Sequence, residues 1–334
     1  MSGYLLKGEW KTGWYDTRAS GGEFQRAAST FRDWVTADGS RGGFKAETGR
    51  YHLYVSLACP WAHRTLIFRK LKRLEEVISV SVVDPVIAEQ GWAFSDAAGC
   101  TRDTVNGFQY LRQVYTAANP TYTGRVTVPV LWDKQRGTIV NNESSEIIRM
   151  FNSAFDAFTS VATDYYPERL SSRIDEINAF VYERVNNGVY RCGFAGTQQA
   201  YDRAFDVLFA ALDELEARLT TTRYLLGNEI TEADWRLFTT LLRFDAVYYL
   251  HFKCNLRRVA EYPALSRLLR ELCCAPGVAD TIDMDHIKRH YYLSHRQLNP
   301  SGIVPKGPAL DFLPAAQPTP NGSGPSAGMH EDSG

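Results

Sequence analysis

The pattern of apolar and polar positions divides the chain into two kinds of segment. Between residues 51 and 152, short apolar runs that indicate strands alternate with longer runs of helical period. In the run 59–74, Ile67, Leu71 and Leu74 recur at steps of four and three, as expected for one face of a helix. The order strand, helix, strand, helix, strand, strand, helix predicts an α/β fold for this part.

The expected elements can be placed by residue number. We predict strands at 51–56, 77–85, 128–133 and 138–141, and helices at 59–74, 108–118 and 143–152. A long insert, at about 86–107, precedes the second of these helices.

Beyond Tyr166 and Pro167 only helical patterns remain, and apolar residues at 170, 174, 177, 181 and 185 step by three or four. We therefore predict an all-α second half. The predicted organisation is an aromatic-rich N-terminal arm packed on the body (1–49), an α/β domain (50–158), an all-helical domain (165–308) and a disordered Pro/Gly/Ser-rich tail (309–334).

Composition excludes several function classes. The chain has 334 residues, 44% of them apolar, and a formal net charge of -1, which gives no reason to expect nucleic acid as a partner. No apolar run approaches the roughly 20 residues of a membrane span. The N-terminus lacks the apolar stretch of a secretory signal, so we expect a cytoplasmic protein with reduced thiols.

The stretch "YVSLACPWAHRTL" places Cys59 between a strand and a helix that starts at Pro60. The unpaired N–H groups and the dipole of a helix N-terminus favour a thiolate, and His63 and Arg64 would add positive charge. We therefore predict a lowered pKa for Cys59, although a small buried thiol is the alternative. Ala62 stands where a redox pair would have its second cysteine, so an outside thiol must complete the reaction, and glutathione is the abundant candidate.

Two further stretches fit a bound peptide. Pro129 begins a strand, and a cis bond after Val128 would present the backbone of Val128 to a peptide-like ligand, unless Pro129 is an ordinary edge-strand proline. Glu143 and Ser144 begin a helix, where they could hold the charged end of a ligand or simply cap the helix.

Taken together, these residues resemble a known family. The motifs "CPWAHR", "GWAF", "GRVTVPVLWDK", "IVNNESSEI", "NNGVYRCGFA", "RFDAVYYLHFKCN" and "HIKRHYYLSHRQLNP" are similar to those of the Xi-class glutathione transferases, the S-glutathionyl-hydroquinone reductases. The resemblance covers about residues 4–308. It implies a thioredoxin-like α/β N-terminal domain and an all-α C-terminal domain, and Thr231 and Asp234 match the buried helix cap of that superfamily.

The resemblance also implies the roles of individual residues. Cys59 would take glutathione from an aromatic ring as a mixed disulfide, and a second glutathione would release it as GSSG. Implied glutathione contacts are Trp92, Arg125, Val128, Glu143 and Ser144, and the implied quinol-site residues are Tyr190, Tyr248 and Tyr291. The family further implies a homodimer through the helical half, with glutathione as co-substrate.

Other readings stay open at this point. An omega-like thioltransferase or dehydroascorbate reductase would share the single cysteine, and a non-catalytic carrier of glutathione conjugates is a rival of another class. We expect no metal, because His286, His290 and His295 have no acid or thiol nearby that completes a ligand set. The sequence does not identify the physiological quinone, the purpose of the tail or the role of Cys192.

Overall fold

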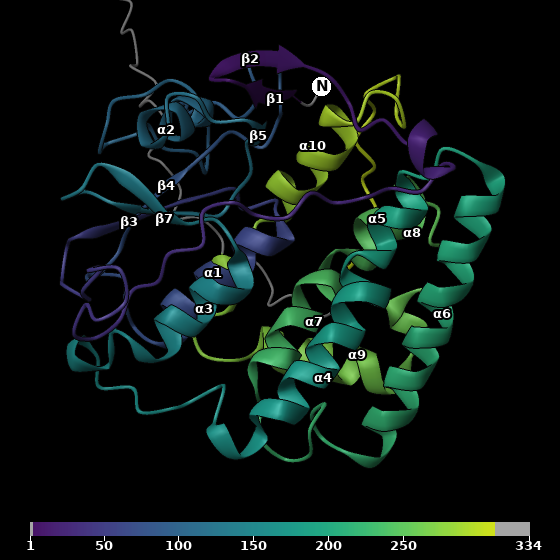
Figure 1. Cartoon of the computed structure of the whole chain (residues 1–334). Helices are drawn as coiled ribbons and strands as arrows, with labels where there is room; N and C mark the ends of the chain where they lie inside the picture. Colours follow the sequence, from purple (N-terminus) through teal and green to yellow (C-terminus); the bar gives the residue numbers. More distant parts are fainter. Residues whose placement is uncertain (1–2, 311–334) are drawn as a thin grey trace, which may run out of the picture.

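The computed structural model describes residues 3–310, and it consists of an α/β part and a helical part that lie side by side (Figure 1). The predicted fold class, an α/β domain followed by an all-α domain, is confirmed. Residues 311–334, which make up nearly all of the predicted tail, lie outside the described residues.

The central sheet of the α/β part has four strands in the order β4-β3-β6-β7. These strands are β3 (Tyr51–Val55), β4 (Ser79–Val82), β6 (Val130–Asp133) and β7 (Thr138–Asn141). β3 is parallel to β4 and antiparallel to β6, and β6 is antiparallel to β7. Every residue of β3 is buried, so this strand forms the centre of the core.

Three helices flank this sheet, namely α1 (Pro60–Leu71), α2 (Leu111–Ala118) and α3 (Ser144–Ser153). α1 packs against α3, whereas α2 contacts the edge strand β7. Both predicted helix starts, at Pro60 and near Glu143, are confirmed. The predicted insert contains no helix and no named strand between β4 and α2.

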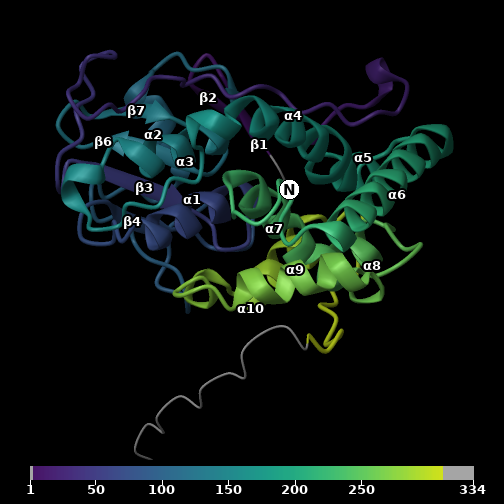
Figure 2. The same cartoon turned by 90° about the horizontal axis from the view of Figure 1, so that it is seen from below.

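The helical part comprises α4 (Ser171–Val181), α5 (Gly188–Gly193), α6 (Gln198–Thr221), α7 (Glu232–Arg243), α8 (Tyr249–His251), α9 (Pro263–Cys273) and α10 (Met284–Ser294). Two π-helical segments, Tyr182–Asn186 and Phe244–Tyr248, follow α4 and α7. α7 contacts α1 and so joins the two parts, while α6 lies on the side away from the sheet (Figures 1 and 2). None of the helices in residues 3–310 is long and apolar enough to cross a membrane.

The N-terminal arm contains two strands that the sequence pattern did not indicate. Its first residues form a hairpin of β1 (Gly3–Leu6) and β2 (Glu9–Thr12), and β1 also pairs with β5 (Gly124–Arg125) in a second, three-stranded antiparallel sheet. Strands of four residues carry too few positions for alternation to reveal them.

The rest of the arm crosses from one part of the molecule to the other (Figure 1). On the helical part, the carbonyl oxygen of Gly22 accepts a hydrogen bond from the N–H of Gly196, and Glu23 pairs with Arg203. On the α/β part, Arg32 pairs with Glu146 of α3. The arm therefore ties the two parts together.

The cap predicted at the start of α7 is present. The Asp234 carboxylate accepts hydrogen bonds from the N–H of Thr231 at 2.9 Å and from the N–H of Leu225 at 2.9 Å. Asp234 and Thr231 are both buried, so no water can replace these acceptors. The cap thus fixes both the start of α7 and the loop before it.

Replacing Asp234 by Ala should lower the free energy of unfolding by roughly 3 kcal/mol, because two buried N–H groups lose their acceptor and the helix loses its cap. Chemical denaturation measures this change. Asp206→Ala, at an exposed position of α6, is the matched control and should stay within about 0.5 kcal/mol of the parent. A loss no larger than that of the control would show that the cap does not stabilise the fold.

Candidate active site

Cys59 is the residue immediately before the first turn of α1. Its carbonyl oxygen accepts the hydrogen bond from the N–H of His63 at 2.9 Å, and its sulfur lies 3.6 Å from the carbonyl oxygen of Val128. The peptide bond between Val128 and Pro129 is cis, as the sequence suggested. Cys59 is partly exposed, and it lines a cavity between the two parts of the molecule.

The predicted pKa of the Cys59 thiol was wrong in direction. Burial raises the pKa of this thiol above its ordinary value, and this effect exceeds all others. The N–H groups of Ala62 and Trp61 at the start of α1, and the cations of Arg243 and Arg26, act in the opposite direction. The helix N-terminus therefore limits the rise in pKa and does not reverse it.

The expected positive charge from His63 is also absent. Burial and the nearby Arg243 lower the pKa of His63 well below its ordinary value, so its imidazole is neutral. Its Nε2 lies 2.8 Å from the hydroxyl of Thr281. Arg64 is buried against the ring of Trp61 and donates to Asn186 at 2.8 Å, so its guanidinium serves the contact between the two parts. The cations that act on Cys59 come from elsewhere in the chain.

One of these cations, Arg243 at the end of α7, holds the turn that precedes Cys59. Its guanidinium donates to the carbonyl oxygens of Ala58 at 2.9 Å and Leu57 at 3.1 Å, and it lies 3.2 Å from Nδ1 of His63. The Arg243 side chain is fully buried. The position of the reactive sulfur in the α/β part thus depends on a residue of the helical part.

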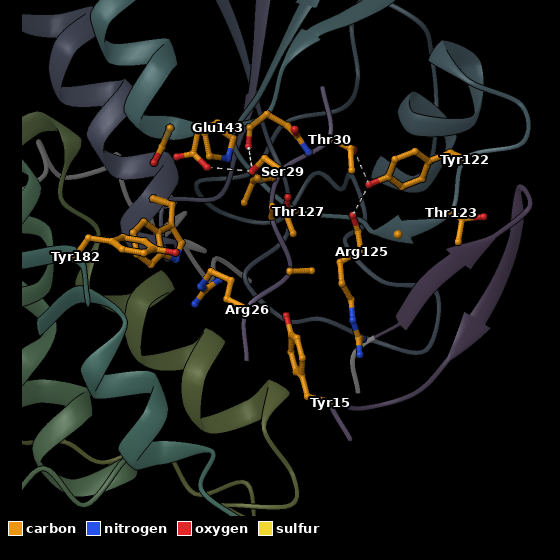
Figure 3. A pocket seen from close by; sticks show the side chains of 18 residues that line it. Tyr15, Arg26, Ser29, Thr30, Tyr122, Thr123, Arg125, Thr127, Glu143 and Tyr182 are labelled. Carbon is orange, nitrogen blue, oxygen red and sulfur yellow. Dashed lines mark hydrogen bonds between the residues drawn. The ribbon is translucent and has the colours of Figure 1, made fainter. Parts of the chain in front are cut away.

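A first cavity, defined by residues 26–30 of the arm together with Val128, Glu143 and Ser144, opens beside the N-terminus of α3 (Figure 3). Glu143 caps this helix by accepting from the N–H of Ser145 at 3.1 Å, and it also accepts from the hydroxyl of Ser29. Arg64 lies 3.5 Å from the hydroxyl of the buried Ser144. The cavity offers polar groups and a helix N-terminus, which suit the charged end of a peptide.

A second cavity adjoins the first, and it is the cavity that Cys59 lines. Its walls include the aromatic side chains of Trp14, Tyr15, Phe24, Trp92, Tyr190 and Phe194. The ring of Trp92 stacks on His290 of α10, with centroids 5.0 Å apart and planes at 15°. Such walls suit a flat aromatic ligand.

The three predicted quinol-site tyrosines form one hydrogen-bonded chain. The hydroxyls of Tyr190 and Tyr291 lie 2.6 Å apart, and those of Tyr248 and Tyr291 lie 3.1 Å apart. Tyr190 alone among them lines the second cavity, because Tyr248 and Tyr291 are almost completely buried behind it. Burial raises the pKa of all three, so their hydroxyls stay protonated and can donate.

Arg125 lines both cavities, but its guanidinium also holds the arm. It donates to the carbonyl oxygens of Gly13 at 2.9 Å and Trp14 at 3.1 Å, and it lies over the ring of Tyr15. The structure therefore places all six predicted residues Cys59, Trp92, Arg125, Val128, Glu143 and Ser144 along the two cavities. Their contacts with glutathione stay a prediction.

Sequence reasoning missed two charged residues at this site. Arg243 stands in the run "LLRFDAVYY", and a cation on an otherwise apolar helix face was a readable signal of a buried role. Arg26 belongs to the arm and lines both cavities, and nothing in its local sequence indicated this.

The two histidines of α10, His286 and His290, form hydrogen bonds with backbone oxygens. His286 lies 2.8 Å from the carbonyl oxygen of Ala98, and His290 lies 2.8 Å from that of Pro85, so both hold the insert in place. Within residues 3–310, no group of three or more His, Cys, Asp or Glu side chains is arranged to hold a metal ion. Cys192 is buried beside Cys254 and does not line either cavity.

Comparison with known proteins agrees with this architecture. A model of the glutathione S-transferase N-terminal domain matches residues 58–154, and one of the C-terminal domain matches residues 198–271. The glutathionyl-hydroquinone reductase YqjG of Escherichia coli is 56% identical over 93% of this chain and 96% of its own length. PcpF of Sphingobium chlorophenolicum, another glutathionyl-hydroquinone reductase, is 57% identical over 92% of this chain and 96% of its own.

Solved structures lead to the same group. The glutathione-bound structure of YqjG has a TM-score of 0.86 and 52% identity, covering 93% of this chain and 97% of that one. The Xi-class glutathione transferase of Natrialba magadii has a TM-score of 0.87 and 50% identity, covering 94% and 96%. With such identity over nearly the whole of both chains, the protein belongs to the glutathione transferase family, in its Xi class of glutathionyl-hydroquinone reductases.

Proposed function

We propose that this protein removes glutathione from S-glutathionyl-hydroquinones, with Cys59 as the nucleophile and free glutathione as the reductant. The observation that carries the proposal is the position of Cys59 in the aromatic cavity, which shares Trp61 and Val128 with the adjoining polar cavity. The glutathione part of the substrate would lie in the first cavity, with its γ-glutamyl end at Glu143 and Ser144 and its backbone along Val128. The quinol ring would lie in the second cavity.

The first step transfers glutathione to the enzyme. The Cys59 thiolate attacks the sulfur that joins glutathione to the ring, so an S–S bond forms and the C–S bond breaks. The electron pair of the C–S bond stays with the ring, whose carbon takes up a proton, and the hydroquinone leaves. Tyr190 would donate a hydrogen bond to the oxygen of the ring, and its contact with Tyr291, which in turn contacts Tyr248, supports this role.

The second step restores the enzyme. The thiolate of a free glutathione attacks the glutathione sulfur of the mixed disulfide, which forms GSSG and releases Cys59. The sulfur of the conjugate and the sulfur of the free glutathione are oxidised together to the disulfide of GSSG. This oxidation balances the reduction of the ring carbon, whose C–S bond becomes a C–H bond. No second cysteine takes part, since Ala62 occupies the place of a resolving thiol.

The rival activities differ in their use of the second cavity. An omega-like thioltransferase or dehydroascorbate reductase needs no aromatic wall, and a carrier needs no nucleophile. We would measure GSSG formation with a glutathionyl-hydroquinone, with a mixed disulfide and with dehydroascorbate. A kcat/KM highest for the hydroquinone supports the proposal, whereas binding without turnover would favour the carrier.

We also propose a homodimer formed through the helical part and a cytoplasmic location. The exposed apolar residues Val207, Leu250 and Leu256 of the helical part support the homodimer. All six cysteines are free thiols, which is consistent with the cytoplasm. Light scattering at micromolar concentration tests the dimer, and a monomeric mass would reject it.

Cys59→Ser should reduce turnover of a glutathionyl-hydroquinone to below about 1% of the parent, because a hydroxyl is a far weaker nucleophile at neutral pH. Glutathione binding, measured by calorimetry, should stay within a few-fold. Cys274→Ser, at an exposed position of the helical part, serves as the control and should leave turnover unchanged. Turnover of Cys59→Ser within a few-fold of the parent would exclude Cys59 as the nucleophile.

Tyr190→Phe should lower kcat by about tenfold or more, because the group that stabilises negative charge on the leaving ring is lost. Tyr291→Phe should lower kcat by less, since it acts on the ring only through Tyr190. Tyr249→Phe is the control, because Tyr249 is half-buried and its hydroxyl makes no hydrogen bond within residues 3–310. If Tyr190→Phe and Tyr291→Phe both matched the parent, the hydroxyl chain would have no part in the reaction.

The rate of Cys59 alkylation by iodoacetamide should rise with pH and should not level off by pH 9, the ordinary pKa of a thiol, because burial raises the pKa of Cys59. Mass spectrometry of the peptide that contains Cys59 separates this rate from the rates of the other thiols. A plateau near pH 7 would mean that the helix N-terminus and the cations outweigh burial.

A further inference from the structure

Arg26 of the arm lies where the two cavities meet, at a place that the reaction described above leaves without a role. It lines both cavities, as do Trp61 and Val128, and Cys59 lines the second of them. Figure 3 shows its side chain in the first cavity, with Tyr15 and Tyr182 to either side. Arg26 therefore lies in the same cavity as Cys59 and beside the polar cavity that adjoins it.

Three aromatic rings surround the guanidinium. The central carbon of the Arg26 guanidinium lies 4.8 Å from the ring centroid of Trp61, 4.8 Å from that of Tyr190 and 5.6 Å from that of Phe24. Trp61 follows Cys59 by two residues in the first turn of α1, and Tyr190 lines the same cavity as Cys59. A cation is attracted to the face of an aromatic ring, so these contacts hold the Arg26 guanidinium in the cavity that contains Cys59.

The Arg26 guanidinium forms no ion pair within residues 3–310. Its one hydrogen bond runs from Nε to the Oδ1 of Asn187 at 3.2 Å, and no carboxylate within residues 3–310 pairs with it. Arg243, by contrast, donates to three backbone carbonyl oxygens, those of Leu57, Ala58 and Thr239. Arg26 is thus a half-buried cation whose two terminal nitrogens can donate hydrogen bonds to another group.

The other ionisable groups around Cys59 supply little positive charge. His63 on α1, His290 on α10 and His295 just after α10 are neutral at physiological pH, because burial lowers the pKa of each. Tyr190 on α5 is protonated, and Arg125 on β5 is bound to the arm. The cations that lower the pKa of Cys59 are Arg243 and Arg26.

We propose that Arg26, held in place by the N-terminal arm, supplies part of the positive charge that stabilises the Cys59 thiolate, so that the arm completes the active site. The inference rests on the proposed function, since it gives the arm a part in that reaction. The thiolate forms at the first step and again when GSSG leaves, and Arg26 would face it both times. An arm that only fastened the two parts together would need no cation at this position.

The test compares Arg26→Gln with Arg26→Lys. Glutamine removes the charge but keeps an amide that can donate to Asn187, whereas lysine keeps the charge. In Arg26→Gln the midpoint of Cys59 alkylation should move up by about one pH unit, and kcat/KM at neutral pH should fall by about tenfold, since each unit removes a factor of ten in thiolate. Arg26→Lys should recover most of both losses.

Arg18→Gln is the matched control, because Arg18 lies in the same arm, is exposed and pairs with Asp16. It should leave the alkylation midpoint and the turnover unchanged. Thermal unfolding of each variant shows whether the arm is still bound. An alkylation midpoint in Arg26→Gln equal to that of the parent would overturn the proposal, as would equal loss in Arg26→Gln and Arg26→Lys.

The two measurements separate this inference from the function on which it rests. Alkylation requires no quinone, so the shift in Arg26→Gln decides the role of Arg26 even if the parent fails to release hydroquinone. If the parent turns over its substrate and the midpoint does not shift, only the inference about Arg26 fails.

Discussion

The site depends on a buried arginine that crosses the boundary between the two parts of the molecule. Arg243 of α7 donates to the carbonyl oxygens of Leu57 and Ala58, and these are the last two residues before Cys59. A buried guanidinium is stable only when its N–H groups have hydrogen-bond acceptors. The turn before Cys59 provides two of these acceptors, and the hydrogen bonds fix its position. Burial, together with the same charge, lowers the pKa of the neighbouring His63 and keeps it neutral. The nucleophile of the α/β part is therefore positioned by the helical part.

This arrangement places the thiol under two opposing effects. A cavity that excludes water suits a bulky aromatic substrate, and the same exclusion raises the pKa of the thiol. The N–H groups at the start of α1 and two arginines from distant segments counter the effect. The balance explains why the site is assembled from the arm, the sheet and the helical part together. A helix N-terminus alone does not hold the anion here.

The sequence predicted the local elements well and the long-range contacts poorly. The β3–α1–β4 unit follows from periodicity and from Pro60, because both act within one element. The cap of Asp234 is likewise local. His63 was misjudged, because its burial and its arginine neighbour come from residues far along the chain. The family resemblance led to the three tyrosines, but it did not show that Tyr248 lies behind Tyr190. Arg26 was missed for the same reason, since Trp61 and Tyr190 are distant in sequence.

In the proposed reaction, glutathione passes through a covalent bond to Cys59. A single-turnover experiment tests this step most directly: the enzyme is mixed with an equimolar glutathionyl-hydroquinone, and no free glutathione is added. We expect about one hydroquinone released for each chain, with glutathione bound as a disulfide to the peptide that contains Cys59. Hydroquinone release with no glutathione on that peptide, or with glutathione on another cysteine, would contradict it.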